Sequence, residues 1–100
     1  QAARWYREHG YEILDRNWRV PGGEIDVIAG VARLVVFAEV KTRATDAFGD
    51  PSLAVTARKQ LRLRRLAAAW LQASGTSRVD VRFDVVSIIG VHVRVIEAAF

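Results

Sequence analysis

The sequence contains no cysteine, which excludes disulfide bonds and thiolate metal sites. It also has no apolar stretch long enough to cross a membrane, because its best run, residues 34–38, lies between Arg33 and Glu39. No signal peptide is recognisable in it. Together these absences favour a protein of the cytoplasm without a membrane partner.

The composition is that of a globular chain. Hydrophobic residues make up 51% and charged residues 26% of the 100 residues. A chain of this length removes about 65% of its unfolded surface from water when it folds, which leaves little room for a second core. We therefore expect residues 1–100 to form a single domain.

The residue pattern predicts the order helix, three strands, helix and two strands. The long helix is expected to begin at Thr56 as its N-cap and to end before Gly75. The segment between the third strand and this helix, residues 42–52, contains glycine and proline and is expected to form a loop. The remaining elements are expected as a helix at residues 2–9 and strands at residues 11–20, 24–29, 34–41, 79–89 and 91–98.

Two of these strands bring acids and a lysine together. Glu39 and Lys41 are two residues apart on a strand, so both side chains leave the same face. The preceding strand alternates strictly over residues 24–29, which places Glu24 and Asp26 on one face. If the two strands pair as a hairpin, the carboxylate of Asp26 approaches that of Glu39.

This grouping predicts metal-assisted chemistry. Two carboxylates close together either take up a proton or hold a cation, and oxygen ligands without clustered histidine suit Mg²⁺ or Mn²⁺. Asp26 and Glu39 are therefore the predicted metal ligands. Lys41 can position or deprotonate a water and compensate the negative charge that develops during phosphodiester hydrolysis. The alternative is an exposed Glu39–Lys41 ion pair at a strand end, which would contribute little.

A cluster of cations lies on the long helix. The chain carries a formal net charge of +4, and no acid occurs between Pro51 and Val79. These cations therefore have no local partners, and we expect them to follow a phosphate backbone, although a solvated helix face or a docking surface for an acidic protein is also compatible with them. The cluster comprises Arg58, Lys59, Arg62, Arg64 and Arg65, of which Arg58, Arg62 and Arg65 share one face.

Several other residues allow two interpretations. Arg19 and Arg43 can contact phosphate or form structural ion pairs. Glu24 can be a metal ligand, a group behind the ligands or a surface charge. Asp84 lies in an apolar strand, where it can orient a basic group at the site or be a buried, hydrogen-bonded structural residue.

The motifs together resemble a known family. The segments GYEIL at 10–14, RNWR at 16–19, GEIDVIA at 23–29, FAEVKTR at 37–43 and FDVV at 83–86 resemble the YraN-like family of bacterial proteins. That family is similar to the Holliday-junction resolvases within the PD-(D/E)XK nuclease superfamily. The resemblance implies an α/β, restriction-endonuclease-like core, a mixed five-stranded sheet flanked by helices. Asp26 matches the aspartate of the superfamily, and Glu39 and Lys41 match its acid-x-Lys motif.

Two departures accompany this resemblance. Ile25 stands where the superfamily has proline before the aspartate. Relatives carry a further acid on the first helix, which falls upstream of Gln1, so part of the first helix and one acid of the site are expected to be missing. In related nucleases a helical glutamine or cation after the acid-x-Lys strand approaches the site, a role that Gln60 can fill.

The sequence thus predicts a Mg²⁺- or Mn²⁺-dependent endonuclease that acts on nucleic acid, with DNA favoured and a resolvase-like homodimer as one possible assembly. One alternative is a nucleic-acid-binding module that keeps the fold with little catalysis. Another is a partner protein that uses the basic helix to dock an acidic surface.

Overall fold

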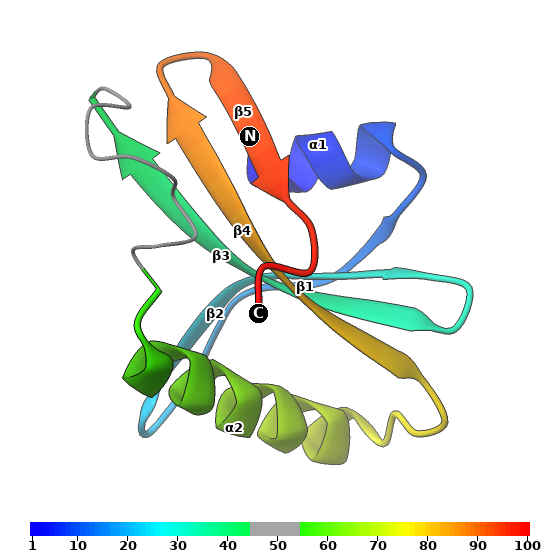
Figure 1. Ribbon diagram of the computed structural model, residues 1–100. Helices are drawn as coiled ribbons and strands as arrows, with labels where there is room; N and C mark the ends of the chain where they lie inside the picture. Colours follow the sequence, from blue (N-terminus) through cyan, green and yellow to red (C-terminus); the bar gives the residue numbers. More distant parts are fainter. Residues whose placement is uncertain (45–54) are drawn as a thin grey trace.

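The computed structural model describes residues 1–44 and 55–100. The predicted order of helix, three strands, helix and two strands is confirmed (Figure 1). The elements are α1 (Ala2–Glu8), β1 (Glu12–Val20), β2 (Gly23–Val31), β3 (Leu34–Arg43), α2 (Ala57–Ser74), β4 (Asp80–Ile89) and β5 (His92–Ile96).

The strands of the described residues form one five-stranded sheet in the order β1-β2-β3-β4-β5. Neighbouring strands are antiparallel, except that β3 and β4 are parallel and are connected through α2. A parallel pair needs such a crossover, whereas an antiparallel pair can be joined by a tight turn. β3 lies in the middle of the sheet, which explains its nearly continuous apolar sequence. The predicted α/β architecture is confirmed, and it is consistent with a restriction-endonuclease-like core.

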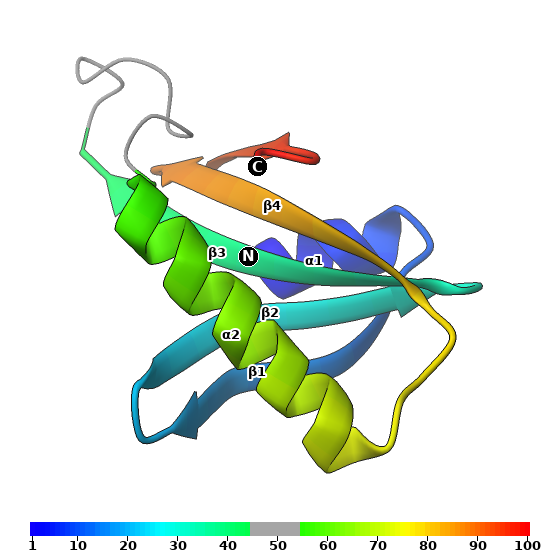
Figure 2. The same ribbon diagram turned by 60° about the horizontal axis from the view of Figure 1, so that its bottom comes forward.

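The two helices cover opposite faces of the sheet. Figure 2 shows α2 crossing one face, with α1 behind the sheet. On the α2 side the core contains Phe37, Trp70 and Phe83, and on the α1 side Tyr6 packs with the cluster that contains Val36. Both faces of the central strands are therefore buried over most of their length.

Helix α2 begins and ends where its sequence predicts. The Thr56 side chain accepts a hydrogen bond from the backbone N–H of Lys59 at 3.2 Å. Gly75 ends the helix with a left-handed φ of 69°, which glycine adopts without a side-chain clash. Its apolar face is buried through Leu63, Leu66, Ala67 and Trp70. In the part of the chain that the structure describes, no helix is long and apolar enough to cross a membrane.

Several predicted boundaries differ from the structure by one or two residues. β2 begins at Gly23 and runs through Gly30 to Val31, instead of spanning residues 24–29. β3 continues past Lys41 to Arg43, because its last residues stay paired with β4, where Arg43 lies opposite Ile89. β5 ends at Ile96 instead of Ala98, whose backbone N–H turns away to donate a hydrogen bond to Asp84 at 3.1 Å. Most of the loop predicted at residues 42–52 falls outside the described residues.

Candidate active site

The candidate site lies where β2 and β3 separate. Their pairing runs from Val31 and Leu34 to Val27 and Ala38 and ends there. Beyond this point a carboxylate oxygen of Asp26 accepts a hydrogen bond from the backbone N–H of Val40 at 2.8 Å. The carboxylate thus satisfies an N–H that a strand partner would otherwise bind, and it is fixed in the gap between the strands.

The strict alternation predicted for residues 24–29 is wrong. Ile25 and Ile28 both belong to the core cluster on the α2 side, whereas Val27 belongs to the cluster on the α1 side. An odd separation between two residues on the same face means that the strand is irregular between them. Asp26 lies within this irregular stretch, next to the end of the β2–β3 pairing.

Glu39 and Lys41 meet at the end of β3. The Lys41 Nζ atom lies 3.3 Å from Glu39 Oε1, and the two side chains are only 21% and 16% exposed. The second oxygen of Glu39, Oε2, is buried and has no hydrogen-bond partner among the described residues. A buried carboxylate oxygen without a partner is costly, so this atom indicates a ligand other than the described protein atoms, such as a cation or a water.

The surroundings of Asp26 favour its protonated form. Burial raises the pKa of Asp26 above its ordinary value, and a side-chain hydrogen bond with Glu24 and the charges of Glu39 and Glu24 raise it further. The hydrogen bond from Val40 lowers the pKa, but it does not compensate. At this site a bound cation would stabilise the ionised carboxylate.

Lys59 also belongs to the site, although its sequence position did not predict this. It lies in the first turn of α2, close enough to Lys41 for the repulsion between the two ammonium groups to lower the pKa of Lys59. The negative charge of Glu39 acts on the same group in the opposite direction. The helical spacing placed Lys59 in the basic cluster, but its approach to Lys41 depends on how α2 packs on the sheet.

Of the two residues predicted near the metal ligands, Glu24 interacts with Asp26 and raises its pKa, whereas Gln60 forms a contact elsewhere. Gln60 donates a hydrogen bond from Nε2 to the carbonyl of Val55 at 3.1 Å and so secures the start of α2. Glu24 forms an ion pair with Arg19 across the β1–β2 pair. Arg19 is 75% exposed, and ion pairs this exposed contribute little to stability. Arg43 ends β3 opposite Ile89.

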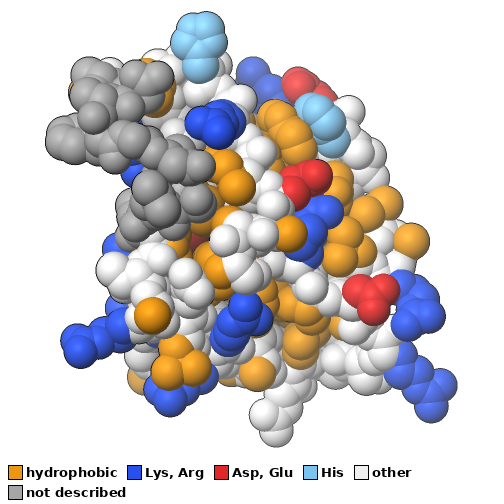
Figure 3. Space-filling model, in the orientation of Figure 1, with side chains coloured by type: hydrophobic (Ala, Val, Ile, Leu, Met, Phe, Trp, Pro, Cys, Tyr) orange, Lys and Arg blue, Asp and Glu red, His pale blue; other side chains and the backbone are white. Residues whose placement is uncertain are grey.

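The four arginines of α2 separate into two groups. Arg58, Arg62 and Arg65 line one groove of about 490 Å³ between α2 and the turn that joins β1 to β2. Arg64 instead places its guanidinium over the rings of Phe83 and Phe100, 4.8 and 5.5 Å from their centroids. Lys and Arg side chains project from the surface over α2 (Figure 3).

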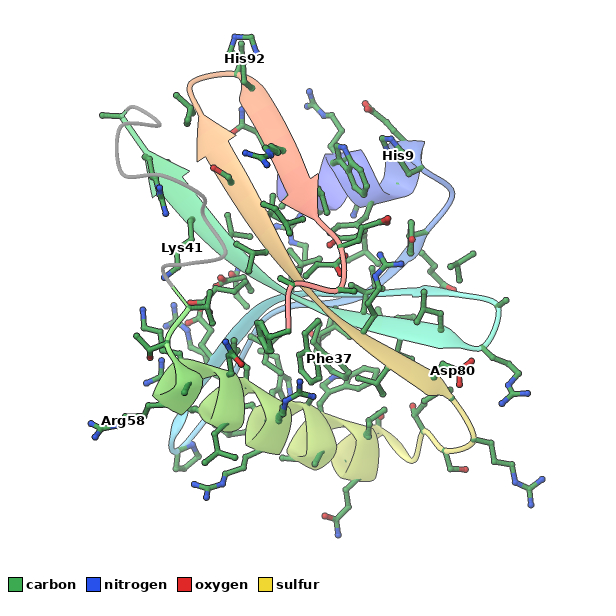
Figure 4. All side chains as sticks on the ribbon, viewed as in Figure 1. His9, Phe37, Lys41, Arg58, Asp80 and His92 are labelled. Carbon is green, nitrogen blue, oxygen red and sulfur yellow. The ribbon has the colours of Figure 1, made fainter. Side chains whose placement is uncertain are left out.

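The two histidines lie apart from Lys41 and from each other. Figure 4 shows Lys41 and Arg58 close to the start of α2, with His9 and His92 away from them beyond α1 and β5. His9 stacks on Trp5, with ring centroids 3.8 Å apart. Neither histidine takes part in the candidate site.

Asp84 belongs to a buried network away from Glu39 and Lys41. It is fully buried and accepts hydrogen bonds from the Tyr6 hydroxyl at 2.7 Å and from the Arg82 guanidinium at 2.8 and 2.9 Å. The backbone N–H of Ala98 donates another. Of the two interpretations of Asp84, the structure supports the buried structural one.

The donor set fits a hard divalent cation. No group of three or more Asp, Glu, His or Cys residues gathers into a metal site in residues 1–44 and 55–100. Mg²⁺ often uses only one or two protein carboxylates and keeps several waters. Asp26 and Glu39, with the unpartnered Oε2 atom of Glu39, match this requirement.

Comparisons with known proteins identify the family. The family described as "Uncharacterised protein family UPF0102" matches residues 1–88. The chain is 52% identical to the UPF0102 protein RHA1_ro06551 of Rhodococcus jostii over 91 residues, 91% of this chain and 77% of the relative. It is 49% identical to the UPF0102 protein of Beutenbergia cavernae over 88 residues, 88% of this chain and 75% of the relative. The chain therefore belongs to the UPF0102 family, the YraN-like family that its motifs indicated.

Proposed function

We propose that this protein is a metal-dependent endonuclease that hydrolyses phosphodiester bonds in nucleic acid, with DNA as its substrate. The observation that carries the proposal is the Glu39 carboxylate, whose buried Oε2 atom has no hydrogen-bond partner among the described residues. Beside it, burial and neighbouring acids raise the pKa of Asp26. A pair of carboxylates in such surroundings is costly unless it holds a cation.

Asp26 and Glu39 would hold Mg²⁺ or Mn²⁺. When bound, the ion supplies an activated water and neutralises negative charge on the phosphoryl oxygens. The protein contributes the orientation of the ligands, because the Val40 N–H fixes the Asp26 carboxylate and Lys41 lies against one oxygen of Glu39.

Lys41 and Lys59 would bind the reacting phosphate. The ammonium of Lys41 can donate hydrogen bonds to a phosphate oxygen or to the attacking water, and it stabilises the charge that develops in the transition state. Lys59 adds a second cation from α2, and the repulsion that lowers the pKa of Lys59 is relieved when an anion lies between the two ammonium groups.

The groove along α2 would hold the nucleic-acid backbone. Arg58, Arg62 and Arg65 line it together, and guanidinium groups form forked contacts with phosphate oxygens. Contacts of this kind carry no base information, so the binding they provide is independent of sequence. Selectivity for branched DNA, which the resolvase resemblance suggests, would come from the shape of the substrate.

The experiment is a cleavage panel with four-way junctions, flaps, single strands and duplexes, made of DNA or RNA and incubated with Mg²⁺, Mn²⁺ or EDTA. We expect nicking by the wild-type protein only with metal, and none by the Glu39→Gln variant. Glu8→Gln is the matched control, because it changes the same chemical group at an exposed position of α1. Equal cleavage by wild type and Glu39→Gln would contradict the proposal.

A second candidate is a nucleic-acid-binding module without catalysis. It is favoured by the absence, among the described residues, of a third acid or histidine that completes a metal site with Asp26 and Glu39. Salt-dependent binding of the same panel without nicking in any metal would identify this function. The two candidates therefore separate in one experiment.

A further inference from the structure

A pocket of about 410 Å³ adjoins the candidate site on the α1 side of the sheet. Its lining includes Asp26 of β2, Val40 of β3 and two consecutive residues of β1, Arg16 and Asn17. It thus shares Asp26 and Val40 with the site described above. Its lining also includes three polar residues that the proposed mechanism does not use, Gln1, Arg16 and Asn17.

Arg16 and Asn17 both line this pocket although they are consecutive in β1. Consecutive residues of a regular strand point to opposite faces. Asn17, however, has a left-handed φ of 50°, a conformation that few residues other than glycine adopt and that asparagine tolerates best. In the register of β1 and β2, Asn17 lies between the pairs Arg16–Val27 and Trp18–Ile25, and is therefore opposite Asp26. Backbone strain persists where the surrounding structure imposes it, often at functional sites.

Arg16 has no partner of its own in the described part of the chain. Its side chain forms no hydrogen bond or ion pair there, whereas Arg19 binds Glu24 and Arg82 binds Asp84. An arginine without a carboxylate partner presents a fork of donors that matches a phosphate group. The amide of Asn17 can donate to the same kind of ligand.

We infer that Arg16 and Asn17 form a subsite for a second backbone phosphate, next to the phosphate that lies at Asp26, Glu39 and Lys41. This inference rests on the proposed function and states how the substrate lies, because the nucleic-acid chain then reaches from the end of β3, past Asp26, to β1. A cation held by Asp26 and Glu39 offsets the repulsion between the Asp26 carboxylate and the phosphate.

The test is a binding scan with an oligodeoxynucleotide in which one phosphate at a time is replaced by a neutral methylphosphonate. Wild type is expected to lose affinity at several positions. Arg16→Ala is expected to bind the unmodified strand on the order of tenfold more weakly and to stop responding at one of those positions. Arg33→Ala removes the same charge from the exposed turn between β2 and β3 and is expected to keep the wild-type pattern.

Two variants of Asn17 separate its amide from its backbone. Asn17→Gly keeps the left-handed conformation and removes the amide, so it is expected to fold and to lose the response at the same position as Arg16→Ala, with a smaller fall in affinity. Asn17→Ala also strains the backbone and is expected to lower stability as well. An unchanged scan for Asn17→Gly would remove the amide from the subsite.

The outcomes for the subsite and for catalysis are separable. If Arg16→Ala keeps every wild-type response, the subsite is wrong, even if the protein cleaves DNA. If Arg16→Ala loses one response but no nucleic acid of the cleavage panel is nicked in any metal, the subsite stands and the catalytic part of the proposed function is wrong. Failure of the wild-type protein to bind any nucleic acid would overturn both.

Discussion

The carboxylate of Asp26 is bound to the backbone N–H of Val40 at 2.8 Å, across the gap where β2 and β3 stop pairing. This single contact holds a partly buried acid close to Glu39. The cost is visible in the raised pKa of Asp26, which means that the surroundings disfavour its charge. Proteins whose functional groups are held in unfavourable surroundings are commonly stabilised when such a group is removed.

Asp26→Asn is therefore expected to increase the free energy of unfolding at neutral pH, by about 0.5–2 kcal/mol. The amide oxygen can still accept the hydrogen bond from Val40, but the buried charge is gone. Because the pKa of Asp26 is higher in the native state than in the unfolded chain, wild-type stability falls as pH rises through that window. The difference between variant and wild type should vanish below the ordinary pKa of 3.8.

Urea unfolding over a range of pH measures this effect, in the absence of divalent metal. Glu8→Gln, at an exposed position of α1, is the control and is expected to leave the profile unchanged. A stability difference between Asp26→Asn and wild type that grows toward low pH would contradict the assignment of the raised pKa.

Variants of the proposed metal ligands should lose metal binding, whereas a variant of Lys41 should not. Asp26→Ala and Glu39→Ala are expected to abolish cleavage and to weaken Mg²⁺ or Mn²⁺ binding in calorimetry. Lys41→Ala should slow cleavage on the order of 10²-fold while the metal stays bound. Its metal affinity should not fall, because the Lys41 ammonium, 3.3 Å from Glu39, competes for the negative charge of that carboxylate. Lost metal binding in Lys41→Ala, with an unchanged circular dichroism spectrum, would overturn this division.

The sequence predicts the elements of this fold because their signals are local. Thr56 and Gly75 mark the ends of α2 through capping chemistry, and the apolar run of β3 indicates a central strand. The geometry around Asp26 was not predictable in the same way. The alternation of residues 24–29 reads as a regular strand, and the irregularity depends on how β1, β2 and β3 pair.

The roles of Lys59 and Asp84 could not be predicted from the sequence either, because they depend on how distant elements pack. Lys59 belongs to a basic cluster in the sequence, but only the packing of α2 brings it near Lys41. Asp84 is an acid in an apolar strand, a pattern that fits a site residue as well as a structural one. Its donors come from α1, β4 and the C-terminal residues, and no spacing in the sequence connects them.

Asp84→Ala is expected to destabilise the protein by about 3–5 kcal/mol, because it leaves the largely buried guanidinium of Arg82 without its main partner. Tyr6→Phe removes one of the donors to Asp84 and should cost about 1 kcal/mol. Urea unfolding measures both. Asp80→Ala, an exposed acid on the same strand, is the control, and an equal loss for Asp80→Ala and Asp84→Ala would contradict the network.

Reversing the charge of the α2 face is expected to weaken binding to all nucleic-acid sequences alike. The triple variant carries Arg58→Glu, Arg62→Glu and Arg65→Glu. The slope of log affinity against log salt should flatten by about 0.9 for each duplex phosphate that the variant no longer neutralises. Reversal of Arg4, Arg7 and Arg33, all exposed and away from this groove, changes the net charge equally and serves as the control. Equal effects of the two triple variants would mean that net charge, and not the groove, governs binding.

Because Lys59 lies near both Lys41 and Glu39, removing the charge of either neighbour should shift the pKa of Lys59, in opposite directions. Repulsion from Lys41 lowers the pKa of Lys59 and attraction to Glu39 raises it, so Lys41→Met should raise this pKa and Glu39→Gln should lower it. NMR titration of the Lys59 side-chain ¹³Cε signal measures both changes. Asp80→Asn is the control, because Figure 4 places Asp80 at the far end of the sheet from Lys41, and its effect on the pKa of Lys59 should be negligible. If Lys41→Met leaves the pKa of Lys59 unchanged, Lys59 does not share the site with Lys41, and its assignment to the reacting phosphate fails with it.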